Sequence, residues 1–236
     1  MFGKNVITKA DYQPVDLQVE EIFYTLQGEG PFAGRPAVFV RLAGCPLRCQ
    51  WCDTQFDTGL SKPRMSVDGI VREVQRHAAA IATLVVITGG EPLRQNITPL
   101  MYDLAEVGFT IQIETAGVVV PPGFLEVVDD TGAVVVCSPK TSKVHPYIAE
   151  NVTHWKYVVG ADDLSESDGL PFKNPQAMHV DSKVFRPYEE DSVIWVSPRD
   201  DHDAEKNAAN VQAAVQTCLR YGYRLSLQVH KLVNLP

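Results

Sequence analysis

Three of the five cysteines in this 236-residue chain fall within one eight-residue stretch. In Cys45-Pro-Leu-Arg-Cys49-Gln-Trp-Cys52 the thiols are separated by three residues and then by two. Soft thiolate ligands select iron–sulfur clusters, zinc or copper(I). A closed iron–sulfur cluster normally uses four cysteines, so a group of three leaves one iron open to another ligand. The spacing therefore predicts an open cluster that could bind and activate a small molecule.

A structural zinc site is the main alternative for this triad. Zinc sites usually show two Cys-x2-Cys-like pairs, and here Cys137 or Cys218 would have to supply a distant fourth ligand. A second motif favours the cluster. Gly89-Gly90-Glu91-Pro92 directly follows the apolar run TLVVIT, and glycines let a ligand approach the backbone closely.

Together, the two motifs resemble the radical S-adenosylmethionine (SAM) superfamily. The resemblance implies a 4Fe-4S cluster on Cys45, Cys49 and Cys52, with the open iron binding the methionine end of SAM. Trp51 would lie near the adenine, and Gly90 would contact SAM. The chemistry implied is one-electron cleavage of SAM to a carbon radical.

A longer stretch narrows this resemblance to one family. TLQGEGPFAGRPAVFVRLAGCPLRCQWCDT (25–54) is similar to 7-carboxy-7-deazaguanine synthases, and the similarity continues at 87–92, 113–117, 138–140 and 227–236. The resemblance implies a carbon–nitrogen lyase that converts 6-carboxy-5,6,7,8-tetrahydropterin to 7-carboxy-7-deazaguanine with loss of ammonia. It also implies a role in queuosine or other 7-deazapurine biosynthesis, a homodimer and a requirement for Mg²⁺.

The same resemblance assigns roles to single residues. The catalytic set would be the three cysteines and Thr54, with Thr54 as the magnesium ligand. Substrate contacts would come from Leu26, Gln27, Gly28, Arg41, Thr88, His230 and Pro236. SAM contacts would come from Trp51, Gly90, Glu114, Ser138, Pro139, Lys140, Ser197, Pro198, Arg199 and Asp200.

Two of these assignments leave alternatives open. Glu114 could bind either the SAM ribose or the edge of the pterin. The segment 197–200 departs from relatives that place a glutamine before the proline, so the resemblance leaves its local contacts open. A substrate contact by Arg41 also makes chemical sense, because a guanidinium pairs well with a carboxylate such as that of the pterin.

Composition bears on partners and location. A formal net charge of −8 disfavours nucleic acid as the direct substrate, because phosphate binding needs basic patches. No apolar run approaches the ~20 residues that span a bilayer, and no secretory signal is visible, so we expect a cytoplasmic protein without membrane contact. The expected partners are the pterin and an electron donor such as a flavodoxin.

The elements that would position these residues alternate along the chain. Apolar runs predict strands buried on both faces at 38–44, 83–90, 109–117, 133–140, 155–160 and 193–198, and an alternating run predicts an edge strand at 224–231. Helices are predicted at 66–82, capped by Ser66, at 96–108, ending at Gly108, and at 203–222, ending at Gly222. This order predicts an α/β fold, and the resemblance implies an abbreviated parallel (β/α) partial barrel of the radical SAM type.

The predicted site lies at one rim of this fold. In parallel α/β architectures the active site lies beyond the carboxyl ends of the strands, and each motif follows a predicted strand. We expect one domain over 1–236. The polar segment 161–192 holds three prolines and is too long for an ordinary connection, so it is predicted to be a long loop or lid.

Two other functions remain open on the sequence alone. One is an activase that installs a glycyl radical on a large enzyme. The other is a non-catalytic iron–sulfur or zinc protein. An activase needs no pterin pocket, so the TLQGEG segment and the HKLVNLP tail argue against it.

Overall fold

The computed structural model describes residues 5–52, 63–78, 81–176, 183–189 and 191–235. Within them, the strands form one sheet in the order β3-β1-β2-β4-β5-β6-β7-β8-β9. The strands are β1 (Leu17–Leu26), β2 (Pro36–Leu42), β3 (Arg64–Met65), β4 (Leu84–Gly89), β5 (Thr110–Thr115), β6 (Val134–Cys137), β7 (His154–Val159), β8 (Val193–Pro198) and β9 (Arg224–Leu225). Every pairing from β2 to β9 is parallel, whereas β1 runs antiparallel to both β2 and β3.

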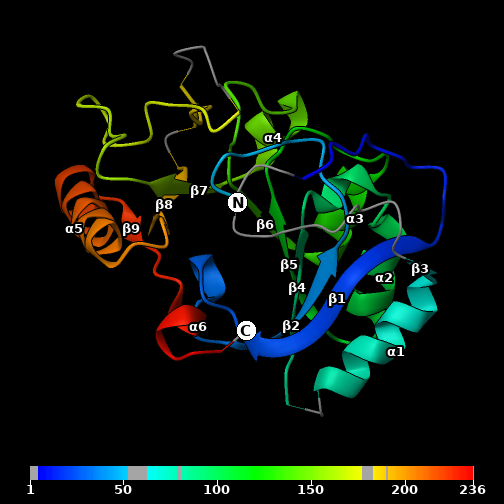
Figure 1. Cartoon of the computed structure of the whole chain (residues 1–236). Coiled ribbons are helices and arrows are strands. Elements are labelled where there is room, and N and C mark those ends of the chain that lie inside the picture. Colours follow the sequence, from blue (N-terminus) through cyan, green and yellow to red (C-terminus); the bar gives the residue numbers. More distant parts are fainter. Residues whose placement is uncertain (1–4, 53–62, 79–80, 177–182, 190, 236) are drawn as a thin grey trace.

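Helices cover the outside of this sheet. They are α1 (Val67–Ala78), α2 (Thr98–Glu106), α3 (Phe124–Thr131), α4 (Pro146–Asn151), α5 (Ala204–Tyr221) and α6 (Val229–Leu232), with short turns η1 (Gly30–Phe32) and η2 (Pro92–Arg94). Figure 1 shows α1 to α4 along one outer side and α5 outside β8 and β9. In contrast, η1 and α6 lie together between the β1–β2 side and the β8–β9 side. The mostly parallel sheet with outer helices confirms the predicted α/β class.

Alternate residues of a central strand enter two different cores. In β4, Val85 and Ile87 pack into the large core under the helices, whereas Leu84 and Val86 belong to a small apolar cluster on the other, inner face. Successive side chains of a strand point to opposite faces, so Thr88 continues the inner row. The inner face is therefore apolar at the start of the strand and polar at its carboxyl end.

Most predicted elements agree with the structure to within a few residues. The six apolar runs form β2, β4, β5, β6, β7 and β8. Ser66 caps α1 as predicted, since its Oγ accepts from the Gly69 N–H at 3.2 Å. Helices α2 and α5 end just before glycines with positive φ, Gly108 and Gly222.

The predicted strand at 224–231 is wrong beyond Leu225. Pro198 ends the neighbouring strand β8 and has no N–H to extend a ladder. The Val229 N–H donates to the Gly28 carbonyl at 3.2 Å instead, and the chain then turns into α6. The last strand is therefore short, and the chain crosses to the other side of the sheet.

Strand β1 was not predicted, and neither were β3, α3 and α4. The run Leu17–Leu26 has two adjacent glutamates, and its pairing with β2 shifts register between Val19 and Glu21. A bulge of this kind breaks the alternation of apolar and polar residues on which a strand prediction depends.

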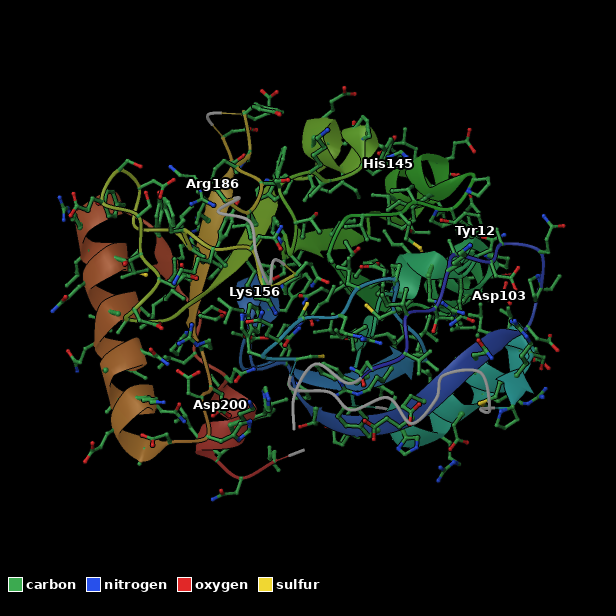
Figure 2. The ribbon with its side chains drawn as sticks, turned by 45° about the horizontal axis from the view of Figure 1, so that its top comes forward. Tyr12, Asp103, His145, Lys156, Arg186 and Asp200 are labelled. Atoms are coloured by element: carbon green, nitrogen blue, oxygen red, sulfur yellow. The ribbon has the colours of Figure 1, made fainter. Side chains whose placement is uncertain are left out.

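The described part of 161–192 has no helix or strand, only an isolated bridge between Leu164 and Pro171. It is nevertheless anchored, because Arg186 (labelled in Figure 2) pairs with Asp168 at 2.8 Å and Phe185 is buried. The described residues of this segment are therefore irregular but held against the core, and the long loop or lid over 161–192 stays a prediction. Separately, none of the described helices is long and apolar enough to cross a membrane.

Candidate active site

The inner face of the sheet forms the floor of a cavity of about 250 Å³. Polar side chains of the strands line it: Arg41 from β2, Thr88 from β4, Glu114 from β5 and Ser197 from β8 near the carboxyl ends, and Lys156 from the middle of β7. Arg41 and Thr88 are direct neighbours in the parallel register. The alternation of the strands therefore gathers these residues on one surface.

The three predicted cysteine ligands line the same cavity. Each sulfur accepts a hydrogen bond from a different donor: Cys45 Sγ from the Leu47 N–H, Cys49 Sγ from Gln176 Nε2, and Cys52 Sγ from Asn5 Nδ2. Thiolates that bind iron carry negative charge, and N–H donors stabilise such charge. The residues present therefore fit a three-cysteine cluster site.

The zinc alternative finds no support in this geometry. A zinc ion takes all its ligands on one centre, whereas each thiolate of a cluster binds a different iron, and among the described residues no three His, Cys, Asp or Glu side chains converge on one centre. Cys137 is buried at the end of β6 and Cys218 lies on α5, and neither lines the cavity. Burial raises the pKa of the Cys45 thiol to about 12, so iron must displace a proton to bind there.

Glycines bring the GGEP turn against the cysteine loop. A Cβ on Gly90 would lie 2.2 Å from the Gly44 carbonyl oxygen and 2.9 Å from the Cys45 Cβ. Gly89 has φ +142°, and a Cβ there would lie 2.1 Å from the Leu42 carbonyl oxygen. Both glycines are therefore required for this close approach, in addition to the SAM contact predicted for Gly90.

The buried side chain of Glu91 holds the same turn in place through hydrogen bonds. It is fully buried, and its carboxylate accepts from the Thr115 hydroxyl at 2.6 Å, the Ala116 N–H at 2.7 Å and the Leu93 N–H at 3.1 Å. Burial raises the pKa of Glu91 to about 7, although these three donors favour the ionised form. The residue ties the end of β4 to the end of β5.

Glu114 lies at the centre of a hydrogen-bond network. Its carboxylate accepts from Gln27 Nε2 at 3.0 Å, Gln112 Nε2 at 3.1 Å and Thr88 Oγ1 at 3.3 Å. Burial acts to raise the pKa of Glu114, but the Lys156 ammonium and the donors from Gln27 and Thr88 outweigh it, so the pKa is lowered. An ionised carboxylate therefore faces the cavity.

A nearly buried ion pair spans the inner side. Lys156 Nζ lies 2.7 Å from Glu29 Oε2, and the Ser197 hydroxyl donates to Glu29 Oε1 at 3.1 Å. Figure 2 shows Lys156 in the interior of the molecule. Glu29 follows β1, whereas Lys156 and Ser197 belong to β7 and β8, so this contact joins the two sides of the curved sheet.

His230 and Gly28 occupy the same side of the cavity. A Cβ on Gly28 would lie 2.0 Å from His230 Nδ1, so the ring sits directly over the glycine. Gln27 is buried and does not line the cavity itself, but it binds Glu114. The predicted substrate residues Gln27 and Gly28 thus support neighbours that reach the cavity.

The residues predicted for SAM meet near the cysteine loop. Lys140 Nζ lies 5.5 Å from the centre of the Trp51 ring and donates to Ser138 Oγ. At the end of β8, the Arg199 guanidinium is held by Asp162 and Asp201, both at 2.8 Å.

Asp200 lies beside α6 (Figure 2), where its carboxylate accepts from the His202 N–H and lies 3.2 Å from Lys231 Nζ. The His202 N–H, with Asn207 and Lys231, lowers the pKa of Asp200 to about 2. Its carboxylate is therefore ionised at the rim of the cavity.

The structure brings most predicted site residues to one cavity. Those that line it are Leu26, Arg41, Cys45, Cys49, Trp51, Cys52, Thr88, Gly90, Glu114, Ser138, Lys140, Ser197, Pro198, Arg199, Asp200 and His230. Pro139 is buried and does not line it. Thr54 and Pro236 lie outside the described residues.

Sequence reasoning missed Glu29, Lys156, Asn5 and Gln176. Glu29 stood inside the TLQGEG motif, and Lys156 was a single cation in the apolar run WKYVVG. A charged residue inside a buried strand signals a buried partner. No pattern marked Asn5 or Gln176.

Comparisons with known proteins agree with this site. Residues 40–155 match the radical SAM superfamily. The chain is 40% identical to the 7-carboxy-7-deazaguanine synthase of Rhodospirillum rubrum over the full length of both, and 33% identical to that of Rickettsia prowazekii over 93% of this chain and 88% of that one. The crystal structure of QueE from Escherichia coli is similar with a TM-score of 0.61 and 26% identity, covering 91% of this chain and 95% of that one.

Proposed function

The chain belongs to the 7-carboxy-7-deazaguanine synthase family of radical SAM enzymes, and on this basis we propose that it converts 6-carboxy-5,6,7,8-tetrahydropterin to 7-carboxy-7-deazaguanine. Loss of ammonia makes it a carbon–nitrogen lyase of 7-deazapurine biosynthesis, the route to queuosine. One observation carries the proposal. Three thiols and a polar floor of mixed charge, containing Arg41, Glu114 and Lys156, face one cavity.

Membership of the family implies a 4Fe-4S cluster and SAM. When bound, they supply a carbon radical that abstracts hydrogen from the substrate. Cys45, Cys49 and Cys52 would hold the cluster at the mouth of the cavity. Trp51, Gly90 and the 138–140 motif would surround SAM. With the cluster, SAM and the substrate filling it, the cavity would exclude water from the reaction.

The polar floor fits the two ends of the pterin. Arg41 pairs with Glu21 at 2.7 Å, but Glu21 is half exposed, so the substrate carboxylate can compete for the guanidinium. Glu114 shares its hydrogen bonds with Gln27 and Thr88, both predicted substrate contacts. These contacts support a role for Glu114 at the amino-pyrimidine edge, rather than at the SAM ribose.

Several finer features remain part of the proposal. Thr54 would bind Mg²⁺ and orient the substrate, and Pro236 would contact the pterin, by resemblance alone. The protein would act as a homodimer in the cytoplasm, with an electron donor such as a flavodoxin. One sheet takes in strands from Leu17 to Leu225, which supports a single domain over 1–236.

The test is an anaerobic assay of reconstituted protein with reductant, SAM and 6-carboxytetrahydropterin. We expect 7-carboxy-7-deazaguanine only when all components are present. Cys49→Ala should abolish the cluster and the product, whereas the matched variant Cys218→Ala should retain both. A wild-type chain with an intact cluster that consumes no pterin would contradict the proposal.

The same assay separates the alternatives. A glycyl-radical activase would form 5′-deoxyadenosine without consuming pterin, and a non-catalytic metal protein would form neither product. The full-length similarity to synthases favours the lyase.

A further inference from the structure

The long segment 161–192 holds side chains that the proposed reaction has not used. Its described part is fixed to the core, since Arg186 pairs with Asp168 at 2.8 Å and the Tyr157 hydroxyl donates to the Phe185 carbonyl at 2.8 Å. From this anchor the chain reaches the cysteine loop. There, the Gln50 N–H donates to the Pro175 carbonyl at 3.3 Å.

Gln176 contacts the cysteine loop with both ends of its amide. Its Oε1 accepts from the Arg48 N–H at 2.7 Å, and its Nε2 donates to Cys49 Sγ at 2.8 Å. A backbone N–H can only donate, so it fixes the orientation of the amide and directs the NH₂ group to the sulfur. Both contacts lie at the middle cysteine of the triad.

We propose that Gln176 is a positioning residue for the iron–sulfur cluster, holding the Cys49 thiolate and stabilising negative charge on its sulfur. The inference rests on the proposed function, because it requires Cys49 to be a cluster ligand. A ligating sulfur carries more negative charge when the cluster is reduced, so an N–H donor favours the reduced form. Gln176 thereby makes the cluster easier to reduce.

Two substitutions separate anchoring of the loop from the hydrogen bond to sulfur. Gln176→Leu removes both contacts at similar size. Gln176→Glu retains an acceptor for the Arg48 N–H but replaces the donor near Cys49 with a carboxylate. Gln216→Leu is the matched control, because Gln216 is exposed on α5.

The main measurement is a redox titration of the reconstituted full-length protein without SAM, followed by electron paramagnetic resonance. At the potential where half of the wild-type cluster is reduced, we expect the reduced-to-oxidised ratio to fall about three- to tenfold in Gln176→Leu, where tenfold corresponds to about 59 mV for one electron. In Gln176→Glu this ratio should fall further, because the negative charge of the carboxylate opposes reduction of the cluster. Gln216→Leu should match the wild type.

A second measurement needs no cluster. Trypsin cleavage after Arg48 in the apoprotein, followed by mass spectrometry, reports how firmly the loop is held. We expect cleavage to be severalfold faster in Gln176→Leu and near the wild-type rate in Gln176→Glu. Faster cleavage and a lost cluster in an otherwise folded Gln176→Leu protein would also support positioning.

The outcomes that overturn the inference are distinct from those that overturn the function. Gln176 variants with wild-type reduced fractions and cleavage rates would overturn the inference alone. A wild-type chain that assembles no cluster would overturn the proposed function and this inference with it.

Discussion

At the scale of single residues, Glu114 in the cavity and Glu91 buried beside it are two carboxylates whose pKa values shift in opposite directions. Glu114 faces a cation and is ionised, whereas Glu91 is enclosed by neutral donors and its pKa is raised. Environments that push pKa values apart assign different tasks to the same side chain. Here, Glu114 faces the ligand cavity, whereas Glu91 binds backbone N–H groups and fixes the turn.

Glu114→Gln should lower pterin turnover by about 10- to 100-fold, because the neutral amide loses the charge-assisted bond to the substrate edge. Cluster content and SAM cleavage uncoupled from pterin should persist. The measurement is steady-state formation of 7-carboxy-7-deazaguanine beside that of 5′-deoxyadenosine. Glu106→Gln, at an exposed position on α2, is the control. Equal loss of both products would place Glu114 at SAM instead.

Glu91 should make the stability of the apoprotein depend on pH. Its folded pKa of about 7 lies above the ordinary value of 4.5, so its contribution is greatest below pH 4.5 and is lost as the pH rises to 7. The free-energy difference between wild type and Glu91→Gln should change by about 3 kcal/mol in this window. Urea unfolding at pH 5 and pH 8 measures it, and a difference that is equal at both values would contradict the assignment.

At the scale of elements, the decisive contact is the crossing of the β4 end with the cysteine loop. It depends on backbone groups that touch without side chains between them. The turn therefore sets the position of Cys45 relative to the strand ends, and any added atom displaces one of them.

Gly90→Ala should destabilise the apoprotein by about 1–3 kcal/mol, because its Cβ would overlap the rigid Gly44 carbonyl. Gly69→Ala is an informative comparison. Its Cβ would lie 3.0 Å from a single side-chain atom, the Ser66 Oγ that caps α1, so the helix propensity gained in α1 is set against a small shift of that cap. Gly69→Ala should therefore cost less stability than Gly90→Ala, chemical denaturation compares the two, and equal losses would show that the crossing is not tight.

The sequence predicted the features that a local pattern encodes and missed those that depend on contacts between distant residues. Buried strands such as β4 were predicted because both faces are apolar, and the cysteine and glycine motifs because their spacing encodes local backbone geometry. Strand β1 and helix α6 were not predicted, since a bulge and a chain crossing have no short-range pattern. The pair of Glu29 and Lys156 joins residues 127 positions apart, which no local motif can reveal.

At the scale of the whole molecule, side-chain contacts complete the wall of the cavity, because the described sheet has free edges at β3 and β9. One of these contacts is an ion pair, the nearly buried pair of Lys156 and Glu29. Removing one partner of a buried pair leaves an uncompensated charge, which is more costly than losing an exposed pair.

Lys156→Met should therefore lower the free energy of unfolding by about 3–5 kcal/mol. Adding Glu29→Gln should restore part of this loss, because Glu29 is then no longer an unpaired buried charge. The control is Arg72→Met, which breaks an exposed pair with Asp68 and should cost less than about 1 kcal/mol. Denaturant titrations of five proteins, the wild type, Lys156→Met, Glu29→Gln, the double variant and Arg72→Met, decide it, and losses in the double variant equal to the sum of the two single losses would contradict the coupling.

The contacts between residues 28–30 and the β7–β9 side of the sheet also have a kinetic consequence. Beside the ion pair, the Gly30 N–H donates to Ser226 Oγ at 3.0 Å and the Val229 N–H donates to the Gly28 carbonyl at 3.2 Å. Breaking these bonds opens the wall but leaves every strand pairing intact. Local openings of this kind can cost less than global unfolding and occur in microseconds to seconds. A transient opening at these contacts would therefore give the pterin a route to solvent while the parallel strands remain paired.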